Sequence, residues 1–329
     1  MKEQINIGVI SDNNYAQHLG VEIFSILKNC SFPENLHFYI SDGGINEENK
    51  EKLRALCSSF RCKVTFLIMS KSDWNLFKGM KMGSHLPPFV YSKILFPTKL
   101  KNLKKMLILD SDIIVEGDIS ELYRTNLDGK TIGAVPDGYI ELQEICKKNL
   151  GISKEKEYFN TGVMLIDCIK WRKYNVLGNL IDFIKKNPDK IYVQEQDGLN
   201  ATLQDEWKQL PYEWNVIHLF YYHSRDLKRK LGKEKLNEII KHPKIIHFTT
   251  KPWVYDKVHP LANRYWYYLK QTPWKDSTYP NKNTKTFFLR MFKLIIRPIP
   301  WEIKIKIKNF FKKIFGKPDK TGFYYVGKN

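Results

Sequence analysis

Two acidic residues, Asp110 and Asp112, directly follow the apolar run Met106 to Leu109, with one serine between them. Carboxylates are costly to bury in an apolar run without a partner, so their position predicts a loop at the end of a strand. In extended chain the two side chains would point to opposite faces, whereas a turn at Ser111 would let both approach one cation. Oxygen ligands of this kind suit Mg²⁺ or Mn²⁺. The alternative is a pair of solvated loop acids, but the preceding apolar strand favours a pocket.

A second apolar run, which ends at Ile246, is followed in the same way by residues that could bind a ligand. His247 could supply a nitrogen ligand, which favours Mn²⁺ slightly over Mg²⁺. Lys251 could neutralise a diphosphate as a point charge. A lone histidine in such a position is more often a satisfied core residue. The metal interpretation of His247 therefore depends on its lying beside the two acids.

The chain around these motifs alternates short apolar strands with amphipathic helices. This alternation is typical of βαβ units on a mostly parallel sheet, in which ligands bind beyond the carboxyl ends of the strands. The polar loop Ser11 to Asn14 occupies that position after the first strand. The expected strands are 5–10, 36–40, 64–69, 106–109, 113–115, 131–135, 162–166 and 244–246, and the expected helices are 15–29, 46–60, a short one within 88–97, and 169–186.

The composition fits one large domain or two small ones, because 329 residues with 43% hydrophobic and 14% aromatic side chains can form a packed core. The five cysteines include no C-x-x-C pair, which predicts reduced packing residues rather than a zinc or redox site. The net charge of +19 would also suit a nucleic-acid-binding protein. Against that class, most of the excess lies after residue 280, in a segment without a nucleic-acid recognition motif.

Residues 281–329 differ in kind from the rest and contain 13 Lys or Arg against two acids. Ile303, Ile307 and Phe310 share one helical face, and lysines crowd the other. This pattern predicts an amphipathic helix that lies on an anionic membrane, and the alternative is a solvated appendage packed on the main domain. We therefore expect a main domain over residues 1–280 and a membrane-associating tail over 281–329.

The location of the protein follows from the same segments. The N-terminus lacks the apolar run and the cleavage site of a secretory signal. No stretch reaches the roughly 20 apolar residues that span a bilayer. The expected location is the cytoplasm, with peripheral association at the inner face of the plasma membrane through the tail.

Five motifs, in their order and rough spacing, make the chain resemble glycosyltransferase family 8 over about residues 5–274. A single D-x-D is a weak signal, but five motifs in order are specific. The segment from His259 to Pro273 is also similar to the end of that family's domain. The motifs are SDNNY (Ser11 to Tyr15), MLILDSD (Met106 to Asp112), YFNTGV (Tyr158 to Val163), EQD (Glu195 to Asp197) and HFTTKPW (His247 to Trp253).

The resemblance implies a GT-A fold, in which a Rossmann-like mixed central sheet is flanked by helices. It also implies the retaining transfer of a hexose, galactose or glucose, from a UDP-sugar with Mn²⁺, or Mg²⁺ as the alternative. The family includes bacterial lipopolysaccharide α-galactosyl- and α-glucosyltransferases and glycogenin. The basic tail favours a lipid-linked saccharide acceptor of a lipopolysaccharide, capsule or similar envelope glycan over a protein acceptor. A non-catalytic sugar-nucleotide-binding relative is disfavoured, because all three presumptive metal ligands are present.

Carried over residue by residue, the resemblance assigns three groups of site residues. The metal ligands would be Asp110, Asp112 and His247. The catalytic group would be Gln196, Glu195 and Asp137, near the donor sugar. The substrate-binding residues would be Ile10, Asp12, Asn14 and Tyr15 at the uridine, Lys251 at the diphosphate, and Lys93, Asp110, Ser111, Asn160, Glu195 and Gln196 around the rest of the donor.

Three positions depart from the family's pattern. Lys93 stands where the family usually has Arg, so a single charge replaces a bidentate contact. Glu195 stands where Asp is common and is one methylene longer. The segment from His247 to Lys251 is shorter and lacks a Gly that lets backbone approach phosphate closely. These departures affect the choice of sugar more than the ligation of metal.

Glu195 and Gln196 also bear on the mechanism that the resemblance implies. A double displacement would need a carboxylate on the opposite face of the sugar, and Glu195 is a candidate. The family commonly places an amide there, matched by Gln196, and an amide is a poor nucleophile. We therefore expect front-face attack, in which the acceptor hydroxyl enters on the side from which UDP leaves. The metal would neutralise the charge that grows on UDP.

Overall fold

A computed structural model describes residues 3–80, 88–222, 224–253 and 259–277. One compact unit spans Met1–Ser277. The expected amphipathic tail over 281–329 lies outside the described residues, so the two-part division of the chain stays a prediction. Among the described helices, none combines the length and the apolar character needed to cross a membrane.

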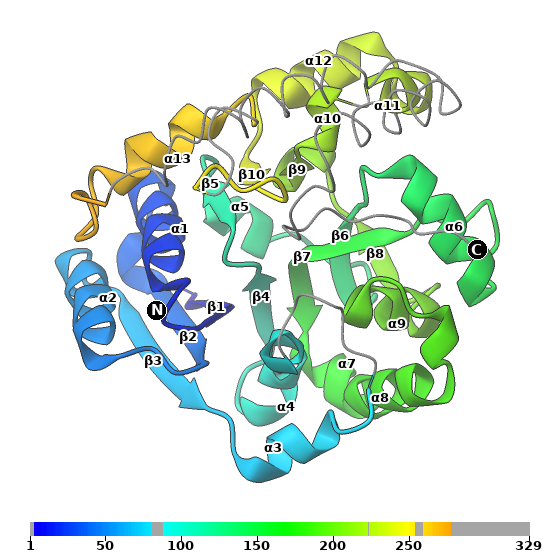
Figure 1. The fold of residues 1–329 in the computed structure, drawn as a ribbon, viewed down its shortest axis with the longest axis horizontal. Helices are drawn as coiled ribbons and strands as arrows, with labels where there is room; N and C mark the ends of the chain where they lie inside the picture. The colour runs from blue at the N-terminus through cyan, green and yellow to red at the C-terminus, as the bar shows by residue number, and fades with distance from the viewer. Residues whose placement is uncertain (1–2, 81–87, 223, 254–258, 278–329) are drawn as a thin grey trace, which may run out of the picture. The chain divides into compact units, whose positions relative to one another are not determined.

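The core of the unit is a seven-stranded mixed sheet in the order β3-β2-β1-β4-β7-β6-β8 (Figure 1). The first four of these strands are parallel, whereas β7 is antiparallel to both β4 and β6. The mixed sheet agrees with the architecture that the family resemblance implies. The strands are β1 Ile5–Ser11, β2 Leu36–Asp42, β3 Lys63–Ile68, β4 Lys105–Leu109, β6 Ile132–Pro136, β7 Phe159–Asp167 and β8 Trp207–Gln209.

A second sheet of three short strands has the order β5-β10-β9. Strand β10 (Ile245–His247) is antiparallel to β5 (Ile113–Val115) and parallel to β9 (Val216–Ile217). In this register His247 pairs with Ile113, the residue that follows Asp112. The small sheet therefore fixes the distance between the two motifs that the sequence singled out.

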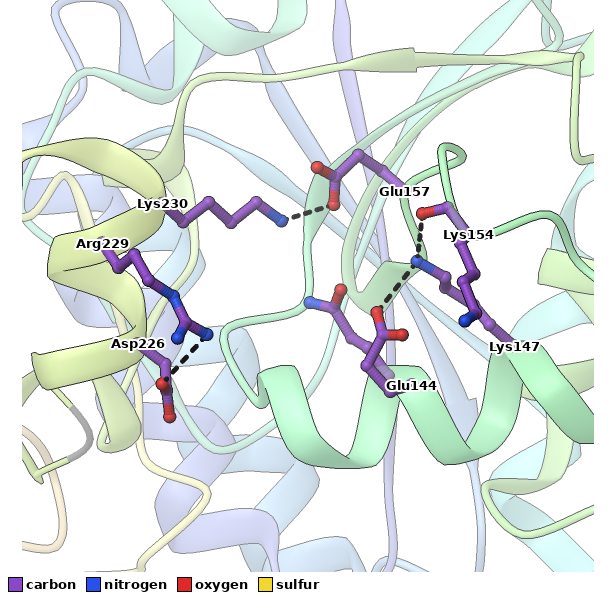
Figure 2. Close-up of a pocket in the computed structure, with 8 residues that line it drawn as sticks. Glu144, Lys147, Lys154, Glu157, Asp226, Arg229 and Lys230 are labelled. Carbon is purple, nitrogen blue, oxygen red and sulfur yellow. Dashed lines mark hydrogen bonds and ion pairs between the residues drawn. The ribbon is translucent and has the colours of Figure 1, made fainter.

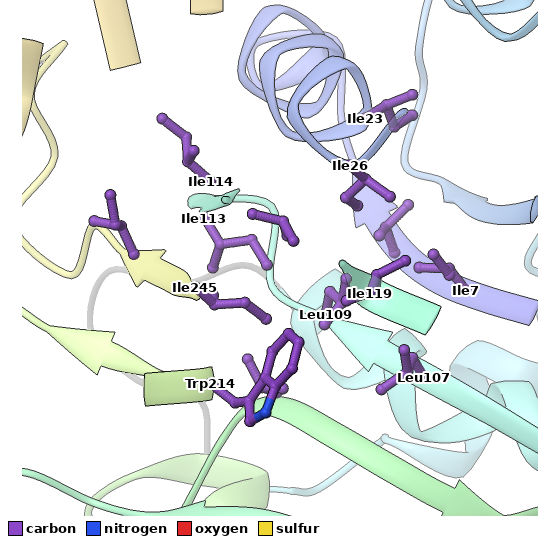
Figure 3. Close-up of a cluster of buried hydrophobic side chains, with 14 of the residues drawn as sticks. Ile7, Ile23, Ile26, Leu107, Leu109, Ile113, Ile114, Ile119, Trp214 and Ile245 are labelled. Carbon is purple, nitrogen blue, oxygen red and sulfur yellow. The ribbon is translucent and has the colours of Figure 1, made fainter. Parts of the chain in front are cut away.

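Helices cover both faces of the large sheet, and the alternation of side chains along β4 shows why. Leu107 and Leu109 pack with Ile23 and Ile26 of helix α1 (Ala16–Asn29) in one apolar cluster, part of which Figure 3 shows. Met106 and Ile108 point to the other face, into a second cluster that also contains residues of β6 and β7 and of helices α7 (Cys168–Lys173) and α8 (Val176–Lys186). A strand buried on both faces reads as a continuous apolar run, as this one does.

The helices are α1 Ala16–Asn29, α2 Glu47–Ser59, α3 Lys71–Leu76, α4 Phe96–Lys99, α5 Ile119–Tyr123, α6 Ile140–Leu150, α7 Cys168–Lys173, α8 Val176–Lys186, α9 Gln194–Thr202, α10 Leu219–Tyr222, α11 Ser224–Leu231, α12 Lys233–Lys241 and α13 Ala262–Leu269. All five cysteines are free and buried, which agrees with their expected role as packing residues.

Three expected elements differ from those observed. The helix expected over 169–186 is two helices, α7 and α8, because Asn175 adopts a left-handed conformation with φ of 47°, which Asn tolerates better than most residues. The strand expected over 162–166 begins earlier, at Phe159, because its polar residues face the site rather than end the strand. The short helix expected within 88–97 is a 3₁₀ helix, Pro88–Leu95, followed by α4.

Candidate functional site

The loop Asp110 to Asp112 joins β4 of the large sheet to β5 of the small one, and three contacts hold it. The Asp110 amide donates to the Gly162 carbonyl at 2.9 Å, and the Asp112 carbonyl accepts from the Phe248 amide at 2.8 Å. The Ser111 hydroxyl donates to the carbonyl of Ile10, at the end of β1. The loop is thus tied to β7, β10 and β1, so both carboxylates have fixed positions.

The structure brings His247 to the two carboxylates, as the sequence predicted. Its Nε2 lies 3.2 Å from Oδ1 of Asp112 and 3.9 Å from Oδ2 of Asp110. One ligand atom from each of the three residues lies within 4.8 Å of the others. Two carboxylates and an imidazole form a donor set that could hold a divalent metal ion.

Asn215, which the sequence analysis missed, orients the histidine. Its Oδ1 lies 2.9 Å from Nδ1 of His247, and its Nδ2 donates to Oδ1 of Asn160 at 2.8 Å. Because this amide is held with its oxygen toward the ring, it can accept a hydrogen bond from Nδ1, and Nε2 is the nitrogen that faces the acids and could ligate a metal. No sequence signal marks Asn215, which follows Trp214 in an irregular segment.

The close approach of the histidine ring also depends on Gly162. A Cβ atom at this position would lie 2.4 Å from Cε1 of His247, well inside van der Waals contact. A side chain here would therefore displace the ring from the two acids. The donor chemistry, the orientation of the imidazole by Asn215 and this glycine together fit a resident metal ion.

Lys251 lies on the other side of Asp112, with 2.5 Å between its Nζ and Oδ2 of the carboxylate. Burial alone would raise the pKa of Asp112, but the charge of Lys251 and the proximity of His247 lower it well below its usual range. The same ammonium lies 5.5 Å from the ring centroid of Tyr15. Lys251 therefore stands between the candidate metal ligands and the candidate uridine loop.

The loop from Ser11 to Tyr15 leads into α1 as the sequence predicted. The Oδ1 of Asp12 accepts from the Tyr15 amide at 2.9 Å, which closes a turn. An aromatic group forms beside it: Tyr15 meets the Trp253 ring edge-on, and His18 stacks on Trp253 with centroids 3.8 Å apart. Burial and the charge of Lys251 lower the pKa of His18 to about 3, so this imidazole is neutral. Asn14 is exposed on the loop, and the role of the loop in binding uridine stays a prediction.

Lys93 is buried, with 2% of its side chain exposed, and bridges two carboxylates. Its Nζ lies 2.7 Å from Asp110 Oδ1 and 2.8 Å from Glu195 Oε1. Burial would lower the pKa of Lys93, but the two carboxylates raise it above its usual value, so the ammonium is charged. This bridge was not foreseen, and it joins a candidate metal ligand to a candidate catalytic residue.

Asp137 anchors the predicted catalytic group. Its Oδ2 accepts from Nε2 of Gln196 at 3.1 Å and from Nδ2 of Asn160 at 3.0 Å. The other end of the Gln196 amide accepts from the Thr161 backbone at 3.0 Å. These residues meet at the carboxyl end of β6, the start of β7 and the start of α9, and their catalytic roles stay predictions. Asp197, the next residue, instead accepts from the backbone of Tyr192 and Val193 and from the Tyr158 hydroxyl.

Comparisons with known proteins agree with this geometry. The model of the family described as "Glycosyl transferase family 8" matches residues 6–257. General stress protein A of Bacillus subtilis is 32% identical over 278 residues, which cover 83% of this chain and 95% of that protein. The lipopolysaccharide 1,2-glucosyltransferase of Escherichia coli K12 is 25% identical over 296 residues, which cover 89% and 86%.

The fold is similar to that of solved glycosyltransferases. A crystal structure of an active-site mutant of LgtC superposes with a TM-score of 0.72 at 24% identity, covering 84% of this chain and 98% of that one. The galactosyltransferase LgtC in complex with donor and acceptor sugar analogues gives a TM-score of 0.69 at 22% identity, covering 85% and 99%. These likenesses establish the GT-A fold. Together with the match of the family model over most of the chain, they place this protein in glycosyltransferase family 8.

Proposed function

We propose that this protein is a retaining, metal-dependent hexosyltransferase. It moves galactose or glucose from a UDP-sugar to a saccharide of a lipopolysaccharide, capsule or similar envelope glycan. The observation that carries the proposal is the convergence of Asp110, Asp112 and His247 at the ends of β4 and β10. The names of the E. coli glucosyltransferase and of the LgtC galactosyltransferase support a hexose donor and a saccharide acceptor.

The donor diphosphate lies beside these three residues, within reach of Lys251. Mn²⁺ or Mg²⁺ bound there would supply a Lewis acid that neutralises charge on the UDP leaving group. Asp110, Asp112 and His247 would hold it. The Lys251 ammonium exchanges its contact with Asp112 for the diphosphate, as a single point charge. The uridine occupies the loop from Asp12 to Tyr15, which is tied to the metal loop through Ser111 and Ile10.

The donor sugar faces Asn160, Gln196 and Asp137, and the transfer proceeds on one face of it. The bond between C1 and the phosphate oxygen breaks and UDP leaves with the electron pair. The acceptor oxygen bonds to C1 on the same face, and its proton passes to the departing phosphate. Both ends of the Gln196 amide are hydrogen-bonded, and the Glu195 carboxylate is held by Lys93. These contacts favour positioning roles over attack on C1.

A UDP-release assay across a panel of UDP-sugars tests the proposal. We expect slow, Mn²⁺-dependent hydrolysis of UDP-galactose or UDP-glucose, because water can replace the acceptor. Asp112→Asn should lose this activity while remaining folded by circular dichroism. Release of no UDP from any sugar, or release unaffected by chelation, would contradict the proposal. A glycosyl adduct on Glu195 seen by mass spectrometry would overturn front-face attack alone.

We also propose that the protein works in the cytoplasm at the inner face of the plasma membrane. The amphipathic, basic composition of residues 281–329 supports this, and a lipid-linked acceptor gives membrane binding a purpose. The test is co-sedimentation with vesicles of anionic phospholipid, for the full chain and for a chain lacking residues 284–329. Equal binding of the two chains would contradict it.

A further inference from the structure

A charged cavity lies outside the site described above, between α6, the segment that follows it, and α11. Its volume is about 280 Å³. Figure 2 shows Arg229 and Lys230 of α11 on one side and Glu144 and Lys147 of α6 on the other. The lining consists of polar and charged residues, namely Gln143, Glu144, Lys147, Lys154, Glu157, Asp226, Arg229 and Lys230.

One of the positively charged side chains that line the cavity, Lys147, is buried and hydrogen-bonded. Lys147 has 6% of its side chain exposed, and its Nζ lies 3.1 Å from Oε1 of Glu144 and donates to the Lys154 carbonyl at 2.8 Å. An ammonium so far from solvent is costly unless hydrogen-bonded, and here both partners belong to the same wall. The wall between α6 and Lys154 therefore has a fixed charge pattern.

The opposite wall carries cations that are less engaged. Arg229 contacts Asp226 through one nitrogen at 3.4 Å, and 81% of its side chain is exposed. Lys230 pairs with Glu157 across the cavity at 2.6 Å. Ion pairs this exposed stabilise a fold by about 0–1 kcal/mol. Their contribution to stability therefore does not explain why these charged residues lie together. Among the described residues, Asp226 is the ion-pair partner of Arg229, so most of the hydrogen-bond donors of this guanidinium can serve a ligand.

The cavity adjoins the candidate donor-sugar group. The Gln143 side chain, which lines it, donates to the backbone carbonyl of Asp137. The carboxylate of Asp137 in turn holds Gln196 and Asn160. The Gln143 side chain would therefore lie between a molecule in the cavity and Asp137, which belongs to the group that faces the donor sugar in the proposed function.

We propose that this cavity is an acceptor subsite for a saccharide unit that carries an anionic group, a phosphate or a carboxylate. The inference rests on the proposed function. Glu144, Glu157 and Asp226 accept hydrogen bonds from sugar hydroxyls, while Arg229 and Lys230 bind the anionic substituent with charge-assisted hydrogen bonds. The volume is near the lower end of that of small-molecule pockets, which suits one sugar unit.

Binding of small probes to the full chain tests the subsite. Glucose 6-phosphate, glucuronate, glucose and inorganic phosphate are titrated by calorimetry or NMR with Mn²⁺ and UDP present at saturation, so that the donor site is filled. We expect glucose 6-phosphate, glucuronate or both to bind at least about tenfold more tightly than glucose, because a charge-assisted contact is added. Which of the two binds better identifies the anionic group.

The matched variants are Arg229→Glu with Lys230→Glu, and Lys228→Glu with Lys235→Glu, which make the same charge change at exposed positions outside the cavity. The first double variant should bind the anionic sugar probe about tenfold or more less tightly than the native protein does. The second should lose less than about twofold in this affinity. Equal losses in the two variants, equal affinities for charged and neutral sugars, or inorganic phosphate binding as tightly as glucose 6-phosphate would overturn the proposal.

Hydrolysis of the UDP-sugar separates this inference from the proposed function. The control variant, Lys228→Glu with Lys235→Glu, should keep the metal-dependent UDP release of the native protein, because both residues are exposed and lie outside the cavity. Absence of UDP release from the native protein would refute the proposed function, while the probe titrations would still report whether the cavity binds anionic sugars.

Discussion

At the scale of single residues, the hydrogen bond between Asn215 and His247 decides which imidazole nitrogen faces the two acids. Asn215→Ala removes the acceptor for the Nδ1 proton, so the ring can take the other tautomer or turn. Loss of such an outer contact weakens metal affinity by about 10–100-fold. We predict that the Mn²⁺ concentration for half-maximal UDP release rises by about this factor, with smaller change in the rate at saturating Mn²⁺.

The matched control for this prediction is Asn179→Ala, which removes an exposed amide that caps the Tyr174 carbonyl, away from the site. Its Mn²⁺ dependence should equal that of the native protein. An unchanged Mn²⁺ dependence in Asn215→Ala, with the variant still folded, would show that His247 is not oriented by this amide or is not a ligand.

Lys93 is the residue at which the departure from the family's pattern has a structural consequence. It neutralises Asp110 and Glu195 at 2.7 and 2.8 Å. Lys93→Met would leave two carboxylates facing each other with little solvent, and breaking a buried pair in this way costs about 3–5 kcal/mol. Because Asp110 is 28% exposed, we predict a loss in the free energy of unfolding at the lower end, about 3 kcal/mol, measured by urea denaturation without metal.

Two further variants sharpen this measurement. Lys93→Met combined with Glu195→Gln should recover part of the loss, because one of the facing charges is gone. Lys99→Met removes the more exposed pair with Asp73 and should cost less than about 1 kcal/mol. A loss in Lys93→Met no larger than in Lys99→Met would contradict the role of Lys93 as a buried bridge.

At the scale of elements, α1 carries an unexpected buried acid. Glu22 is fully buried, and neither carboxylate oxygen has a hydrogen-bond partner among the described residues. Burial, and then the charges of Asp112 and Asp110, raise the pKa of Glu22 well above 4.5. The folded protein therefore keeps a proton here that the unfolded chain releases near its ordinary pKa.

This linkage gives a signed pH dependence. Between pH 4.5 and the raised folded pKa, the native state binds more protons at Glu22 than the unfolded state, so this residue lowers stability by about 1.4 kcal/mol per pH unit as pH rises. Glu22→Met removes this pH-dependent loss of stability. We predict that the variant gains stability over the native protein between pH 5 and pH 8 in urea denaturation. Glu51→Met, at an exposed site on α2, should leave the pH profile unchanged, and equal profiles for both variants would refute the prediction.

Much of the fold follows from the sequence because its strongest signals are local. The run Met106 to Leu109 is buried on both faces, and such a run predicts a central strand. The break at Asn175 was missed because the apolar pattern continues across it, and only the backbone conformation at one residue separates α7 from α8. Helices α6 and α9 were missed because polar residues interrupt their apolar periodicity, among them Gln143 and Gln196, which hydrogen-bond to Asp137.

The residues of the candidate site likewise include some that the sequence could predict and some that it could not. Residues at strand ends, such as Asp110 and His247, could be foreseen because the topology brings strand ends together. The roles of Asn215 and His18 could not be foreseen. Asn215 contacts His247, 32 residues away in the chain, and His18 contacts the Tyr265 hydroxyl, 247 residues away. The Lys93 bridge needed the positions of both carboxylates, which only the folded chain defines.

At the scale of the whole molecule, two lysines pair with the two carboxylates of the candidate metal site. Lys93 pairs with Asp110 and Lys251 with Asp112. Lys93 is deeply buried, but Lys251 is 30% exposed and stands beside the candidate uridine loop, so it is the one able to move. A divalent cation and Lys251 compete for Asp112, whereas a diphosphate gives Lys251 another anion. Metal and UDP should therefore bind with positive coupling, which is reciprocal by thermodynamic necessity.

This coupling is measurable as stabilisation of the whole fold, because a ligand that binds only the native state raises the unfolding temperature. We predict that Mn²⁺ and UDP together raise it by more than the sum of their separate effects. Lys251→Met should bind Mn²⁺ alone more tightly, since the competing ammonium is gone, and UDP with Mn²⁺ more weakly. Lys241→Met, at the exposed end of α12, should behave as the native protein does. If Lys251→Met left the effect of Mn²⁺ alone unchanged, the lysine and the cation would not share Asp112, and the coupling would need another origin.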